Sequence, residues 1–367
     1  MRLAQIEVHR VRNIHHAELH FSPTCNLFFG PNGSGKSALL EAIHLLGRGK
    51  SFRTHQFRQI IQYGQNDAIV AANLTQDDAM TLRAGIRLTS QEMTVRLGLN
   101  HHAKRSDLVR VLPIQWIDPC SYLLITGSPQ YRREFLDWGV FNEYPDFLQL
   151  WRRYRLALLQ RNQLLKTRVV ASLESWNQQL SLYGSQIAEY REHYLQRLLP
   201  IFLELSEKLI PLRGLSLHYL AGWPRDKMLL QSLHDDVAKD LRHGFTHNGP
   251  HRADFVLYAA ERPVSEFVSR GQLKLLVLAL KLAQVSLAFN QSIRPCVLID
   301  DIAAELDGNH LRLLLDVLSL SAAQVFITST QFTPTFAESH FADRSVFHVE
   351  HGKIAPIEVP RETLLSK

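Results

Sequence analysis

The sequence predicts an α/β protein in which a mixed sheet flanked by helices is assembled from both ends of the chain and interrupted by a helical insertion. Strand-like runs alternate with helical patterns in residues 1–127 and 244–367, whereas residues 128–243 are mainly helical. We therefore expect a head built from both termini and a helical arm subdomain between its two parts. The 367 residues, 46% of them hydrophobic, are enough to bury a sizeable core.

Strands are expected where apolar residues alternate with polar ones or form short uninterrupted runs. These segments are 3–8, 18–21, 26–29, 68–73, 81–88, 113–117, 215–219, 255–258, 296–299, 324–328 and 345–349. Since they fall at both ends of the chain, we expect one sheet that takes strands from both termini.

Helices are marked by start signals and by apolar residues at helical spacing. Ser128 and Pro129 suit the N-cap and the first position of one helix, and Pro145 suits the start of the next. The other expected helices are 37–46, 172–199, 227–241, 269–288 and 310–318. The helices within 128–243 are expected to form an antiparallel arm.

The net charge permits a polyanionic partner such as DNA. Lysine and arginine total 41 against 35 for aspartate and glutamate, which gives a formal net charge of +6. Three basic clusters are candidates for phosphate contacts, although a solvated surface is the simpler interpretation of each. The clusters are Arg48, Lys50, Arg53, His55 and Arg58; His101, His102, Lys104 and Arg105; and Arg152, Arg153 and Arg155.

The composition favours a cytoplasmic protein that does not span a membrane. The most apolar stretch, 275–289, is interrupted by Lys281 and Gln284. Residues 1–10 alternate between charged and apolar types, unlike a secretion signal. The three cysteines show no metal-ligand spacing, so we expect them to be reduced thiols.

A glycine-rich segment between an apolar strand and an amphipathic helix predicts a nucleotide site. It fits the pattern G-x-x-x-x-G-K-S, in which backbone N–H groups surround phosphate oxygens. Its residues are Gly30, Pro31, Asn32, Gly33, Ser34, Gly35, Lys36 and Ser37. Lys36 is expected to reach the β and γ phosphates of ATP, and Ser37 to hold Mg²⁺. The alternative is a glycine-rich turn without a ligand.

A loop of this kind requires an acidic partner at the end of a buried strand. The apolar run 296–299 is followed by Asp300 and Asp301. We expect Asp300 to be a ligand of Mg²⁺, mainly through water, and Asp301 to orient or deprotonate the attacking water as a catalytic residue beside Lys36. A carboxylate pair that merely ends a strand is the alternative.

The long interval between these motifs indicates one subgroup of ATPases. It comprises 263 residues (300 − 36 − 1), and it contains a segment that opens a helix and is similar to the signature of ABC-type ATPases. The segment consists of Ser269, Arg270, Gly271 and Gln272. In that family the signature approaches the phosphate of a nucleotide held by the other protomer. The similarity implies an ABC-type P-loop ATPase head with a composite ATP site.

The chain resembles the RecF family, bacterial recombination-repair ATPases related to the structural-maintenance-of-chromosomes proteins. Besides the nucleotide motifs, the resemblance rests on Arg12-Asn13-Ile14, residues 47–54, Gly127-Ser128-Pro129, Arg132, Arg133, Phe135, Leu136, Asp137 and Gly249-Pro250-His251-Arg252. The chain departs from the family at Ala253, where the family pattern has an acid. The stretch 116–121 also departs, and Gln115 is the candidate for the Q-loop residue.

The resemblance implies a weak, DNA-dependent ATPase that dimerises when ATP is bound. It implies binding to DNA at single-strand gaps and junctions, without sequence preference, and slow hydrolysis that releases the DNA. It also implies that the protein works with RecO and RecR to promote the loading of RecA.

Three kinds of function stay open as alternatives on the sequence: a transporter subunit, a small-molecule kinase or GTPase, and a scaffold. The ATPase subunit of an ABC transporter shares the loop and the signature, but it would carry a switch histidine where Thr328-Ser329-Thr330 stand. A GTPase would need a guanine-reading Asn-Lys-x-Asp sequence, and a small-molecule kinase would not need the Ser269 signature. A scaffold that binds ATP and hardly hydrolyses it is the third.

Overall fold

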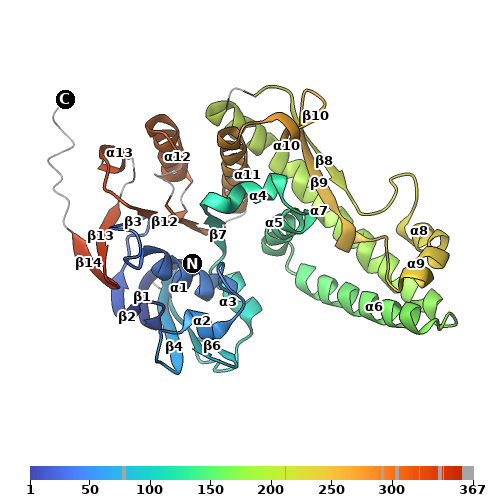
Figure 1. The fold of residues 1–367 in the computed structure, drawn as a ribbon, viewed down its shortest axis with the longest axis horizontal. Coiled ribbons are helices and arrows are strands. Elements are labelled where there is room, and N and C mark those ends of the chain that lie inside the picture. Colours follow the sequence, from blue (N-terminus) through green and yellow to red (C-terminus); the bar gives the residue numbers. More distant parts are fainter. Residues whose placement is uncertain are drawn as a thin grey trace. The chain divides into compact units, whose positions relative to one another are not determined.

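The computed structural model describes residues 1–76, 80–210, 212–290, 293–301, 306–321, 323–337, 341 and 343–357. It forms two compact units, each described here by itself (Figure 1). The first combines Met1–Cys120 with Ala288–Lys367, and the second is Ser121–Leu287. The first unit draws on both ends of the chain, as the sequence predicted for the head.

A six-stranded sheet of the first unit carries the strand that precedes the glycine-rich loop. Its order is β14-β13-β3-β12-β11-β7. The strands are β3 (Cys25–Phe29), β7 (Ile114–Ile117), β11 (Cys296–Ile299), β12 (Gln324–Ser329), β13 (Arg344–Glu350) and β14 (Lys353–Ile357). All neighbours are parallel except β13 and β14. The strand β3 therefore lies between two strands that follow it by about three hundred positions.

A second, five-stranded sheet is antiparallel throughout, with the order β2-β1-β4-β5-β6. Its strands are β1 (Arg2–Val11), β2 (Ile14–His20), β4 (Asp67–Thr75), β5 (Thr81–Thr89) and β6 (Met93–Leu97). The expected sheet with strands from both termini is therefore present, but the other N-terminal strands form this second sheet, which the sequence did not predict, and the burial patterns give the reason. In β4 every second residue is buried, whereas β11 and β12 are buried throughout, so the strands suit different environments.

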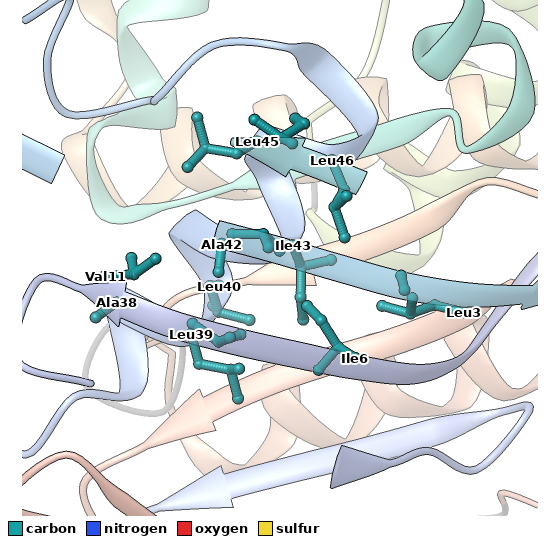
Figure 2. Close-up of a cluster of buried hydrophobic side chains, with 14 of the residues drawn as sticks. Leu3, Ile6, Val11, Ala38, Leu39, Leu40, Ala42, Ile43, Leu45 and Leu46 are labelled. Carbon is teal, nitrogen blue, oxygen red and sulfur yellow. The ribbon is translucent and has the colours of Figure 1, made fainter. Parts of the chain in front are cut away.

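Helix α1 (Lys36–Arg48) supplies the centre of the core between strands of both sheets. Its residues Leu39, Leu40 and Ile43 are fully buried. Figure 2 shows labelled side chains of α1 and of β1 pointing toward one another, among them Leu3 and Ile6. Because α1 starts in the glycine-rich loop, this packing fixes the direction of the helix that follows the loop.

The remaining helices of the first unit are short. They are α2 (Phe57–Ile60), α3 (Arg105–Val111), α12 (Gly308–Leu320) and α13 (Pro334–Ala337). The first turn of α12 is capped by Asp307, whose carboxylate accepts hydrogen bonds from the N–H groups of Asn309 and His310.

The second unit consists mainly of helices with one small sheet. Its helices are α4 (Leu123–Thr126), α5 (Pro129–Glu143), α6 (Phe147–Thr167), α7 (Leu173–Leu209), α8 (Leu229–Asp235), α9 (Val237–His243), α10 (Val264–Phe267) and α11 (Arg270–Asn290), with 3₁₀ turns at Pro119–Tyr122 and Pro250–Arg252. Helices α6 and α7 follow one another and pack together as a hairpin. The sheet has the order β10-β9-β8, from Arg262–Pro263, Asp254–Ala259 and Leu215–Leu220.

The strand positions expected from the sequence are confirmed for all eleven segments, within three residues at most ends. The pattern did not reveal β6, β10 and β14. The helix expected at 227–241 is two helices that meet at Asp236, which has φ −92° and ψ 5°. The expected boundary after residue 243 would separate β8 from β9, which pair along their whole length. Residues 244–287 pack in the second unit, and their assignment to the ATPase head stays a prediction.

Helix α11 is, within the described residues, the one helix long and apolar enough to cross a membrane by length and composition. Its most apolar window has a mean hydropathy of 1.5, and 72% of that window is buried in the structure. A buried core helix has the same composition, so this helix is weak evidence for a membrane span.

Candidate functional site

The glycine-rich loop connects β3 to α1 and turns sharply at three glycines. Gly30, Gly33 and Gly35 have φ values of 155°, 78° and 122°, a region that L-residues with side chains rarely adopt. A Cβ atom on Gly30 would lie 2.0 Å from the carbonyl oxygen of Val349. Glycine is thus required at this position by the neighbouring strand as well as by the turn.

Two hydrogen bonds from outside the loop hold its middle. The side-chain amide of Asn13 donates to the carbonyl oxygen of Gly33 over 3.2 Å. The backbone N–H of Gly352 donates to the carbonyl oxygen of Ser34 over 2.7 Å. The loop is therefore fixed by residues that lie far from it in the sequence. This arrangement keeps the backbone in one conformation before a ligand binds.

Lys36 is 6% exposed and folds back over the loop. Its Nζ donates to the carbonyl oxygens of Gly30, at 2.7 Å, and Pro31, at 3.0 Å. Burial lowers the pKa of Lys36, while the nearby carboxylates of Asp301 and Asp300 act in the opposite direction. The cation lies where a bound phosphate chain could replace the carbonyl oxygens as its partner.

Asp300 faces the loop from the end of β11. Its Oδ1 accepts hydrogen bonds from Ser37 Oγ at 3.0 Å and from Thr328 Oγ1 at 2.7 Å. The two sequence motifs, 263 positions apart, thus meet at one carboxylate. A hydroxyl and a carboxylate are oxygen donors of the kind that Mg²⁺ prefers, so this donor set fits the ion.

Asp301 differs from its neighbour in its contacts. Its backbone has φ 50°, in the left-handed region, and its N–H donates to Thr328 Oγ1 at 2.9 Å. Its Oδ1 is buried and has no hydrogen-bond partner among the residues that the structure describes. An unpaired buried acceptor in a strained backbone is common at functional sites.

A cavity of about 300 Å³ collects these groups. It is lined by the loop and α1 residues 32–38 together with Arg12, Asn13, Arg53, Asp300 and Asp301. Arg12 lies in this lining with φ 53°, and its guanidinium forms two hydrogen bonds of 2.8 Å with the fully buried carboxylate of Glu41. Ser51 Oγ also donates to that carboxylate. Glu41 therefore connects the Arg12 turn with the segment that carries Arg53.

Ser269–Gln272 belong to the second unit and open α11. Ser269 N–H donates to Gln272 Oε1 over 3.1 Å, and Gln272 N–H donates to Ser269 Oγ over 3.3 Å, a reciprocal cap. Ser269, Arg270 and Gly271 are exposed. Apart from its chain neighbours and the adjoining helix backbone, no described atom lies within 4 Å of the place a Cβ would take on Gly271.

Other residues that the sequence singled out occupy structural positions. Gln115 is 4% exposed on β7, and its assignment as the Q-loop residue stays a prediction. Asp254, beside the departing Ala253, pairs with Arg132 over 2.5 Å between Oδ1 and Nε. That carboxylate therefore anchors α5 to β9.

Sequence reasoning missed two parts of the site. It noted Thr328 only as the position of a transporter's histidine, whereas its hydroxyl contacts Asp300 and Asp301. It also gave no role to Glu41, because a glutamate in an amphipathic helix is usually solvated. For Thr328, the sequence did offer one signal: it stands at the end of a buried apolar strand.

A family model described as "RecF/RecN/SMC N terminal domain" matches residues 2–354. The DNA replication and repair protein RecF of Pseudomonas aeruginosa (strain UCBPP-PA14) is 39% identical over 362 residues, covering 97% of this chain and 98% of the relative. The protein of the same name from Pseudomonas putida (strain GB-1) is 39% identical over 368 residues, covering 99% and 100%.

Solved structures share the fold. The recombination mediator protein RecF-ATP in the RecFOR pathway matches with a TM-score of 0.85 at 24% identity, covering 97% of this chain and 98% of that one. The Smc head domain from Pyrococcus furiosus matches with a TM-score of 0.61 at 16% identity, covering 99% and 97%. The predicted fold, an ABC-type P-loop ATPase head with a helical subdomain, is confirmed. With a family model over nearly its whole length and relatives at 39% identity, the chain belongs to the RecF/RecN/SMC family and, within it, to the RecF group of DNA replication and repair proteins.

Proposed function

We propose that this protein is a DNA-binding repair ATPase whose homodimer is assembled by ATP and released by hydrolysis. The observation that carries the proposal is the hydrogen bond between Ser37 and Asp300, which joins the phosphate loop to the acidic strand end. Membership of the RecF group supports the repair role. A cytoplasmic location is part of the same proposal.

The loop residues 30–37 would hold the phosphate chain of ATP. Lys36 Nζ would exchange its two carbonyl partners for β- and γ-phosphate oxygens, which are stronger acceptors because they are charged. Ser37 and Asp300 would hold Mg²⁺, which supplies positive charge against the phosphate oxygens. A relative with the same fold is described as RecF-ATP, which favours this nucleotide.

Asp301 would act on the attacking water. Its buried, unpaired Oδ1 can accept a hydrogen bond from water, and Thr328 fixes the backbone that presents it. A carboxylate in this position orients the water and takes its proton as the phosphoryl group is attacked. Hydrolysis would be slow, since an aspartate has a shorter reach than a glutamate.

The signature segment would complete the site of a second molecule. Ser269, Arg270, Gly271 and Gln272 begin a 21-residue helix, whose N-terminus carries partial positive charge. Placed against the γ phosphate held by the partner's loop, this helix start would join two nucleotides and two chains in one symmetric interface. Loss of the γ phosphate would remove the contact and open the dimer.

DNA would be the polyanion that the closed dimer retains. The net charge of +6 favours phosphate contacts, which carry no sequence information, so binding would weaken steeply with salt. We propose single-strand gaps and junctions as the DNA targets. RecO and RecR are proposed as partners and RecA loading as the outcome, because a structural relative is described as belonging to the RecFOR pathway.

An ATPase subunit of an ABC transporter is the second candidate, because it uses the same loop and signature. Thr328 stands where a transporter would have its switch histidine, and its hydroxyl is committed to Asp300. The family relatives favour repair.

Multi-angle light scattering with ATP and a gapped DNA duplex tests the proposal. We expect a monomer without nucleotide, a dimer with ATP, and a dimer–DNA complex in low salt. A protein that stays monomeric under all of these conditions would contradict the dimer mechanism. A dimer that binds no DNA would favour the transporter alternative.

A further inference from the structure

Two histidines face each other on the outer side of the five-stranded sheet. His9 on β1 and His16 on β2 are directly opposite in the antiparallel register. Their ring centroids are 4.6 Å apart, and their Nδ1 atoms share a hydrogen bond of 3.3 Å, whose proton a bound metal ion would replace. Cross-strand neighbours of this kind share one face, so both rings project from the same side of the sheet.

The hydrogen bond of Glu7 determines which nitrogen of His9 is free. Glu7 Oε1 lies 2.7 Å from His9 Nε2. An ionised carboxylate only accepts hydrogen bonds, so His9 Nε2 carries the proton and donates it. The lone pair of His9 is then on Nδ1, the atom that faces His16.

The separation of the two Nδ1 atoms matches a metal chelate. A Zn²⁺ ion with ligands at about 2.0–2.1 Å in a tetrahedron places neighbouring nitrogens about 3.3–3.4 Å apart. A carboxylate that accepts the second N–H of a ligating histidine is the usual outer support of such a site. Glu7, His9 and His16 offer ligand atoms that lie within 4.8 Å of one another.

We propose that His9 and His16 bind a divalent transition-metal ion such as Zn²⁺ through their Nδ1 atoms, with Glu7 holding the His9 ring in the ligating tautomer. Imidazole suits Zn²⁺, Ni²⁺ and Cu²⁺, whereas Mg²⁺ prefers oxygen ligands. The site is therefore chemically distinct from the Ser37–Asp300 pair. Water would fill the open coordination positions.

The surroundings leave room for the ion. A hollow of about 820 Å³ lies over the same face and includes Glu7 and His9 in its lining. Two acids pair with cations around the hollow: Glu7 lies 3.8 Å from Arg83, and Asp67 forms ion pairs with both Arg87, at 2.9 Å, and Arg10, at 2.7 Å. These pairs reduce the repulsion that an added cation would meet.

A metal here would connect β1 to β2, the edge strand of the sheet. An ion that binds only the folded pairing stabilises that pairing by an amount that grows with the logarithm of the ion concentration above its Kd. Amide exchange in β2 should then slow when the metal is added, which gives a readout independent of ATPase activity.

The test is titration of nucleotide-free protein with Zn²⁺ in buffer containing Mg²⁺, followed by calorimetry and by hydrogen exchange of β2. The wild type should show one site that Glu7→Gln weakens about 10- to 100-fold. His9→Gln and His16→Gln should weaken it further, and Zn²⁺ should no longer protect β2. The matched control is His20→Gln, an exposed histidine on the same strand, which should behave as the wild type.

Two outcomes would overturn the proposal. One is a His16→Gln variant that binds Zn²⁺ with wild-type affinity and stoichiometry. The other is protection of β2 by Zn²⁺ that is equal in wild type and His16→Gln. His16 is exposed and His9 is half-buried outside the core, so the unfolding curves of His9→Gln and His16→Gln should match that of the wild type. If the curves differ, protection would be compared at equal stability.

Discussion

The phosphate loop and the signature segment contrast in how their polar groups are used. In the loop, Lys36 and Ser34 are buried, and hydrogen bonds from Asn13 and Gly352 fix the backbone. In the signature segment, Ser269 and Gln272 bond to each other, and the residues between them are exposed. The first region is held in one conformation by these hydrogen bonds, whereas the second presents an exposed helix start. This difference is what a composite site between two molecules requires, and the following variants test it.

Among these variants, Asp301→Asn should have the largest effect, and this effect should be confined to the rate of ATP turnover. Removing a general base lowers the rate about 10²- to 10⁴-fold, while ATP affinity and the ATP-dependent dimer should remain. Single-turnover hydrolysis and nucleotide binding measure the two quantities. Turnover equal to wild type would mean that Asp301 is no base and would favour the scaffold alternative.

Lys36→Ala should abolish useful ATP binding. Two charge-assisted hydrogen bonds to phosphate, at about 1.5–3 kcal/mol each, correspond to a loss of affinity of at least about 100-fold. Fluorescent-nucleotide titration measures it, with the exposed Lys353→Ala as the control. Normal affinity in Lys36→Ala would remove the loop from the proposed site.

Asp300→Asn should retain nucleotide and lose most of its turnover. The amide can still accept from Ser37 and Thr328, but it lacks the charge that a metal ligand supplies, so we expect a loss of about 10- to 100-fold. Raising the Mg²⁺ concentration should recover part of the rate. Unchanged turnover at low Mg²⁺ would exclude Asp300 as a ligand.

Ser269→Arg should leave ATP binding intact and weaken the dimer. A long cation buried without a partner in an interface costs about 2 kcal/mol or more, roughly 30-fold in the dimer constant. Sedimentation velocity with ATP measures this, with Ser265→Arg at another exposed serine as the control. A normal ATP-dependent dimer from Ser269→Arg would refute the composite site.

Gly271→Ala should have the smallest effect on the dimer constant, and its result has the most direct interpretation. Beyond its chain neighbours and the adjoining helix backbone, the added methyl group meets no described atom within 4 Å, so the unfolding temperature should not fall. Against a partner's nucleotide the same methyl would crowd the contact by about 1 kcal/mol, roughly fivefold in the dimer constant. An unchanged dimer constant would show that Gly271 stays clear of the interface.

Local pattern was sufficient for the loop and for most strands. The run Gly30–Ser37 and the aspartates after β11 are marked by residue type alone, and the structure places Ser37 beside Asp300, although their roles as ligands stay predictions. The division of the N-terminal strands into two sheets was not predictable, because pairing depends on partners distant in sequence. Thr328 and Glu41 were overlooked for the same reason, since each acquires its role only through side chains brought together by folding.

The position of β3 also affects how the molecule is made. The two neighbours of β3 in the sheet are β12 and β13. The strand that leads into the phosphate loop therefore has no sheet partner until the last part of the chain has been synthesised. About 290 residues separate Phe29 from Gln324, roughly 15–60 s of synthesis at about 5–20 residues per second. During that interval the apolar strand β3 lacks both of its sheet partners, so a chain that ends before β12 would lack both strands that hold the start of the loop.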